Sequence, residues 1–120
     1  MEEVERRILN CRGRRVMFNY PEGEGAYYGK LKDRCVLRVP SWTGVPCWDV
    51  VDLIEFERPE RFEAIRFGYY RLKNGKLIWA SQTTLTEPIE VYKKLFVRAA
   101  KEMEWFKKFL EEVLEEVKKQ

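Results

Sequence analysis

The sequence contains no histidine. Its absence removes the commonest general base, the commonest metal ligand and the Ser-His and Cys-His nucleophile arrangements. A phosphate-binding glycine loop is also missing, because Gly23 and Gly25 lie between acidic residues that would repel a phosphate. Asp49, Asp52 and Glu55 are spaced by three, so neighbours fall on opposite faces of a strand and form no nuclease-like cluster. We therefore predict a non-enzymatic protein with no catalytic residue, no metal and no cofactor.

Cysteine and long apolar segments are scarce. Cys11, Cys35 and Cys47 lack the short paired spacing of zinc and redox motifs, and their odd number argues against a disulfide framework. We interpret them as packing thiols. No apolar run approaches the roughly 18 residues of a membrane-spanning helix. The amino-terminal segment MEEVERRILN lacks the apolar core of a signal peptide. These observations predict a cytoplasmic protein that does not enter a membrane.

Composition indicates one globular domain over residues 1–120. The sequence is 45% hydrophobic and 36% charged, with 23 basic and 20 acidic residues. This ion-pair-rich composition, with few glutamines, is typical of heat-adapted proteins. Residues 1–60 hold ten basic and eleven acidic residues, whereas residues 61–120 hold thirteen and nine. The basic surplus therefore lies in the second half of the chain.

Residues 1–60 are expected to form a short helix and four strands. Val4 and Ile8 are one turn apart, which predicts a helix from Glu2 to Asn10. Alternating apolar and polar positions predict strands over residues 14–20, 27–32, 35–39 and 48–57. Asp33-Arg34 is expected to form a tight turn between the second and third of these strands. In architecture alone, these short strands resemble the small barrels of the SH3 or Tudor type, and such a likeness carries no function.

Residues 61–87 are predicted to form a β-hairpin. Two apolar-aromatic runs are joined by Asn74-Gly75, the strongest short-range signal for a two-residue turn. This turn sets a register in which three pairs face each other across the hairpin: Lys73 and Lys76, Leu72 and Leu77, and Tyr70 and Trp79. The hairpin adds two strands to the predicted sheet.

The two faces of this hairpin differ in chemistry. One face is apolar and is expected to lie on the core; it carries Ile65, Phe67, Tyr69, Ile78 and Ala80. The other mixes large aromatic rings with a guanidinium, which suits a surface that stacks on flat groups; it carries Arg66, Tyr70, Leu72, Leu77, Trp79 and Thr83. The alternative is that both faces are covered, one by the sheet and one by the helix that follows.

No acidic residue occurs between Ala64 and Thr86. Basic side chains interleaved with aromatic rings can follow a phosphate backbone while the rings stack on bases. Binding of DNA or RNA is therefore the leading functional hypothesis. Its predicted site residues are Arg66, Tyr70, Arg71, Lys73, Lys76 and Trp79, joined by Arg12, Arg14 and Arg15.

Residues 88–119 are predicted to form one long amphipathic helix. Apolar side chains recur at alternating steps of four and three, as in a heptad seam; they are Tyr92, Phe96, Ala99, Met103, Phe106, Leu110, Val113 and Val117. A continuous helix of about 30 residues would be about 45 Å long, whereas a domain of this size is roughly 30 Å across. The helix must therefore protrude or bend.

A protruding helix end favours a homodimer through an interface that contains Phe106, Leu110, Val113 and Val117. The alternative is a break near Glu102 that lets the whole helix pack on its own sheet. Dimerisation gives the second functional hypothesis, a protein-interaction or assembly module.

The sequence as a whole predicts an α+β fold. We expect a strongly bent antiparallel sheet of five to six strands, in which an SH3/Tudor-like half-barrel is extended by the hairpin, and a long C-terminal helix. Asp52 shares a strand face with apolar residues, so it is expected to be half buried with an Arg or Tyr partner. A small-molecule pocket near Trp42 and Trp48 is a third, weaker functional hypothesis.

Overall fold

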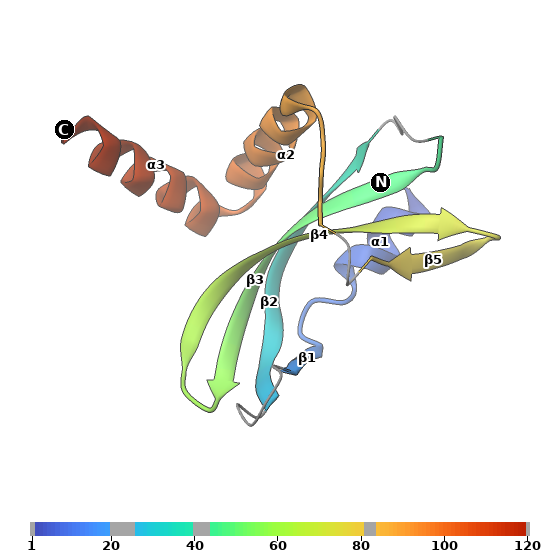
Figure 1. The fold of residues 1–120 in the computed structure, drawn as a ribbon, viewed down its shortest axis with the longest axis horizontal. Coiled ribbons are helices and arrows are strands. Elements are labelled where there is room, and N and C mark those ends of the chain that lie inside the picture. Colours follow the sequence, from blue (N-terminus) through green and yellow to red (C-terminus); the bar gives the residue numbers. More distant parts are fainter. Residues whose placement is uncertain (1, 20–25, 40–43, 81–83, 120) are drawn as a thin grey trace.

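The computed structural model describes residues 2–19, 26–39, 44–80 and 84–119. It shows one five-stranded antiparallel sheet with helices on both faces (Figure 1). The elements in chain order are α1 (Glu3–Leu9), β1 (Arg15–Asn19), β2 (Ala26–Val39), β3 (Cys47–Arg58), β4 (Phe62–Lys73), β5 (Lys76–Trp79), α2 (Ile89–Glu102) and α3 (Glu104–Lys118). Each strand pairs with the next one along the chain. The α+β prediction of a strongly bent sheet followed by a C-terminal helical part is confirmed.

The predicted turn at Asp33-Arg34 is wrong, because β2 is one continuous strand. Its pairing with β3 shifts between Leu31 and Asp33, which marks an irregularity of the β-bulge type. The Asp33 carboxylate accepts hydrogen bonds from the Arg34 backbone N–H and from the Trp105 indole N–H, both at 2.9 Å. Aspartate is typical of turns because it can accept a nearby backbone N–H, and here it does so inside a strand. The sheet therefore has five strands rather than six.

The hairpin has the predicted turn and register. Asn74 and Gly75 have φ angles of 52° and 75°, in the left-handed region that a two-residue hairpin turn requires. Tyr70 lies opposite Trp79, and Lys73 lies opposite Lys76. The Asn74-Gly75 turn therefore sets the register between β4 and β5 as predicted.

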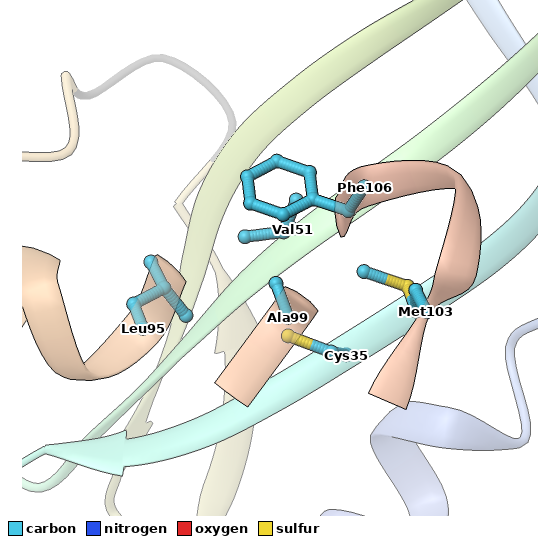
Figure 2. Packing of buried hydrophobic residues seen from close by; sticks show 6 residues of the cluster. All are labelled: Cys35, Val51, Leu95, Ala99, Met103 and Phe106. Carbon is cyan, nitrogen blue, oxygen red and sulfur yellow. The ribbon is translucent and has the colours of Figure 1, made fainter. Parts of the chain in front are cut away.

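Each face of the sheet has its own apolar core. Ile8 of α1 packs against Val36, Trp48 and Val50 on one face. On the other face, α2 and α3 contribute Leu95, Ala99, Met103 and Phe106, which pack with Cys35 and Val51 of the sheet (Figure 2). The alternative prediction, that the sheet covers one hairpin face and the following helix covers the other, is only partly confirmed. The helix α1 packs on the aromatic face, whereas on the other face Phe67 stacks on Phe96 of α2 but stays 41% exposed.

The predicted helix over residues 88–119 is broken at Met103. Met103 is extended, with φ −129° and ψ 106°, and its side chain is buried. Its N–H donates to the Ala99 carbonyl at 2.8 Å, and its own carbonyl accepts the Phe106 N–H at 3.0 Å, so α2 ends and α3 begins at one residue. A break near Glu102 was the alternative expectation and is confirmed. The whole helical part does not pack on the sheet, because residues 111–119 are all exposed.

Candidate functional site

Three charged side chains form a network on the sheet face that α1 covers. Asp52 of β3 accepts hydrogen bonds from Arg34 Nε at 2.6 Å and Nη2 at 2.9 Å. It also accepts two from Arg66 of β4, at 3.0 and 2.9 Å. Asp52 is 0% exposed and Arg34 is 3% exposed, whereas the Arg66 side chain is 22% exposed. The predicted arginine partner of Asp52 is confirmed, although Asp52 is fully rather than half buried.

Arg34 also links α1 and the hairpin to this network through hydrogen bonds. Its Nη1 donates to the Ile8 carbonyl at 3.1 Å and to the Tyr70 hydroxyl at 2.9 Å. Burial by itself would lower the pKa of Arg34, but the hydrogen bonds and charge of Asp52 raise this pKa above its usual value. Arg34 therefore remains a cation inside the protein.

The aromatic rings predicted to stack on a ligand pack against the same network. The Arg66 guanidinium lies 4.8 Å from the Trp79 ring centroid, and the Tyr70 and Trp79 centroids are 4.8 Å apart. The Trp79 ring also occupies the space that a Cβ on Gly68 would need. The structure thus places Arg66, Tyr70 and Trp79 in a partly buried cluster under α1.

The other six predicted nucleic-acid residues lie outside this cluster and are exposed. Arg71, Lys73 and Lys76 surround the turn of the hairpin, and Arg12, Arg14 and Arg15 lie at or just before β1. The Arg12 Nε donates to the Leu9 carbonyl at 2.9 Å. These side chains form two basic groups, one at the hairpin tip and one after α1.

The predicted dimer residues are divided between the core and the surface. Phe106 is fully buried in the core of its own chain, and Leu110 packs at the edge of that core. Val113, Leu114 and Val117 are 46%, 52% and 61% exposed. In Figure 1, α3 extends away from the sheet toward the C-terminus. Of the four predicted dimer residues, only Val113 and Val117, in the distal half of α3, are exposed.

A second buried acid lies on the opposite sheet face. Asp49 is 1% exposed, and no hydrogen-bond donor among the described residues reaches its carboxylate oxygens. Burial and, to a lesser degree, the neighbouring Glu87 together raise the pKa of Asp49 to about 9. Asp49 is therefore protonated, and uncharged, at neutral pH.

The remaining candidates give no reactive site. Burial raises the pKa of the Cys47 thiol, whose Sγ donates to the Val45 carbonyl at 3.3 Å, which fits a packing thiol. Trp42 lies outside the described residues, and Trp48 is buried in the core. Within the described part of the chain, no group of three His, Cys, Asp or Glu side chains could hold a metal ion. No helix described by the structure is both long enough and apolar enough to span a bilayer.

Two of the important charged residues were missed by sequence reasoning. Arg34 was assigned to a turn, and Asp49 was considered only as a member of an acidic set. The available signal was their setting, since apolar residues follow each of them closely in the chain.

Comparisons of the chain with models of protein families, with curated proteins and with solved structures find no match. Any functional inference therefore rests on geometry.

We predict that Asp52→Asn lowers the free energy of unfolding by about 3–5 kcal/mol, because it leaves the Arg34 cation buried without a counter-charge. Replacing both buried partners, Arg34→Met with Asp52→Leu, should cost less, since Arg66 alone can reach water. Urea denaturation followed by tryptophan fluorescence measures the free energy of unfolding of the single and the double variant. Glu63→Gln, which removes an exposed partner of Lys32, is the control and should change stability little. A loss for Asp52→Asn as small as that of the control would contradict the assignment.

We also predict that stability falls as pH rises from about 4 to about 9. The pKa of Asp49 is about 9 in the folded chain and about 3.9 when unfolded, so between these values only the folded state keeps the proton. Asp49→Asn cannot lose a proton, so it should become progressively more stable than the wild type, by at most about 1.4 kcal/mol per pH unit. Denaturation midpoints across this range, with Glu55→Gln on the same strand as control, measure the difference. Equal pH slopes for the wild type and Asp49→Asn would refute the raised pKa of Asp49.

Proposed function

We propose that this chain is a cytoplasmic, non-enzymatic assembly module that forms a homodimer through the distal half of α3. The observation that carries the proposal is the exposure of Val113, Leu114 and Val117 on a helix end that no other described element covers. Burying one such side chain fully contributes about 1.5–3 kcal/mol. Three on one short helical segment can therefore support association.

The charge distribution favours a second copy of this chain as the partner. Residues 111–118 contain four glutamates and one lysine, whereas α2 contains four basic and two acidic residues. One molecule thus carries an acidic apolar helix end and a basic helix surface. Complementary charges of this kind promote encounter and fix orientation between partners.

We predict that Val113→Gln, Leu114→Gln and Val117→Gln together convert a dimer into a monomer without unfolding the chain. All three positions are exposed, and glutamine is a good helix former. Analytical ultracentrifugation over a range of concentrations measures the dimer, and circular dichroism checks the fold.

The matched control is Met17→Gln, because Met17 is another apolar side chain, 56% exposed, on β1. This variant should remain dimeric. A wild-type chain that is monomeric at its highest soluble concentration, or a triple variant that still dimerises, contradicts the proposed function.

Binding of a nucleic-acid backbone is the second candidate, favoured by the exposure of six cations in two groups. These are Arg71, Lys73 and Lys76 at the hairpin tip, and Arg12, Arg14 and Arg15 after α1. Flexible exposed cations bind phosphates by charge and do not need base stacking. Arg66, Tyr70 and Trp79 already have protein partners, so this proposal gives them no direct contact with the ligand.

Fluorescence anisotropy with labelled DNA and RNA tests this candidate. We expect affinity that falls with salt, with a log–log slope as steep as roughly −5 if all six cations meet phosphates. Lys73→Glu with Lys76→Glu should weaken binding, whereas the same change at Lys118 and Lys119 on the distal end of α3 should not. Absence of salt-dependent binding in the micromolar range at low salt would remove the candidate.

A further inference from the structure

We infer that the distal half of α3 docks into a groove along α2 of a second copy, and that the second copy returns the same contact. This inference rests on the proposed homodimer and names the partner surface within it. It differs from the expectation that two α3 helices pair along a common seam.

The receiving surface is a groove that runs along α2 to its corner with α3. Two shallow hollows share Phe96 and Val97 in their linings, so they adjoin each other along α2 and together make up this depression. Its apolar lining consists of Ile89, Tyr92, Phe96, Val97, Ala100 and Leu110. Ile89 is 76% exposed and Val97 is 52% exposed, so this lining is open to solvent. We call this depression the α2 groove.

The charged side chains of the α2 groove are mainly basic. Lys93, Lys101 and Lys107 line it, against one acid, Glu104, and Lys93 also pairs with the nearby Glu90 at 3.3 Å. On the other side of Val97 lie Lys94 and an ion pair of Arg98 with Glu102, 3.8 Å apart. An acidic helix with an apolar stripe is therefore the complementary occupant.

The distal half of α3 has that chemistry. Successive residues of a helix are about 100° apart, so Val113, Leu114 and Val117 form one stripe. Glu111 and Glu116 fall about 60° beyond the two edges of this stripe, and Lys118 falls about 40° beyond the edge at Leu114. Glu116 also pairs with Lys119 at 3.1 Å. When the stripe contacts the groove floor, these two carboxylates lie next to the basic side chains of its rim. The segment of eight residues is about 12 Å long.

The distal half of α3 cannot fill the α2 groove of its own chain. A single residue, Met103, separates the two helices, and its side chain is buried. The Trp105 indole is bonded to Asp33 of β2 at 2.9 Å, which fixes the direction in which α3 leaves the sheet. Figure 1 shows α3 pointing away from α2. A second copy must therefore supply the helix.

Charge also argues against direct pairing of two distal α3 segments. Each segment carries four glutamates and one lysine, so pairing them would bring two acidic surfaces together. Docking on α2 replaces this repulsion with attraction. If each copy gives its helix and receives the other, the contacts close under two-fold symmetry and leave no groove open for a third copy.

Two charge-reversed variants of the full chain test the inference. The groove variant carries Lys93→Glu and Lys101→Glu, both on exposed positions of α2, and the helix variant carries Glu111→Lys and Glu116→Lys. Each variant alone should dimerise at least about tenfold more weakly than the wild type, because both of its reciprocal contacts are like-charged. An equimolar mixture should regain a dimer of near wild-type affinity, because each groove then meets a helix of opposite charge. Analytical ultracentrifugation, with one variant fluorescently labelled, measures the mixed dimer.

The control carries Lys73→Glu and Lys76→Glu, which makes the same charge change at the hairpin tip and should leave dimerisation unchanged. A wild-type dimer that tolerates the groove variant overturns this inference while the proposed function stands. Weakened variants that fail to restore each other in the mixture also overturn it. A monomeric wild type overturns both the inference and the proposed function.

Discussion

The buried pair of Arg34 and Asp52 constrains more of this fold than any other contact. Charges removed from water are tolerated only when their hydrogen-bonding capacity is satisfied. Asp52 accepts four hydrogen bonds from two arginines, and Arg34 Nη1 donates to the Ile8 carbonyl of α1 and to the Tyr70 hydroxyl of the hairpin. In the sheet register, Asp52 lies directly between Arg34 and Arg66. A slip of one residue would turn these side chains to the opposite face, so the network specifies the register of three strands.

This network explains why the two sheet faces have different roles. On the α1 face, the charges, the rings of Tyr70 and Trp79, and the helix satisfy one another, and little is left for a ligand. On the other face, α2 and the start of α3 complete an apolar core, but the next two turns of α3 extend past it. The distal half of α3 therefore carries exposed apolar side chains that the core of its own chain does not cover.

Features set by neighbouring residues could be predicted, and features set by distant ones could not. Asn74-Gly75 specifies its own turn and so fixed the hairpin register correctly. Arg34 reads as part of a turn because its partners Asp52 and Tyr70 lie 18 and 36 residues further along the chain. A break near Glu102 could be expected from the length of the helix, but its exact position at Met103 could not be read from the sequence. Methionine is a good helix former, and the apolar seam continues through it, so only the tertiary demand to bury Trp105 and Phe106 separates α2 from α3.

The break at Met103 separates the basic residues of α2 from the glutamates of α3 in space. In one straight helix, the basic residues of α2 would be followed along the same axis by the glutamates of α3. Two such helices would meet opposite charges when antiparallel and like charges when parallel. The break instead aims the two charge groups in different directions, so neither can neutralise the other within one chain. It also divides the seam, because Phe106 turns inward whereas Val113 and Val117 remain outside. Met103 thus both contributes to the core and directs the distal half of α3 away from it.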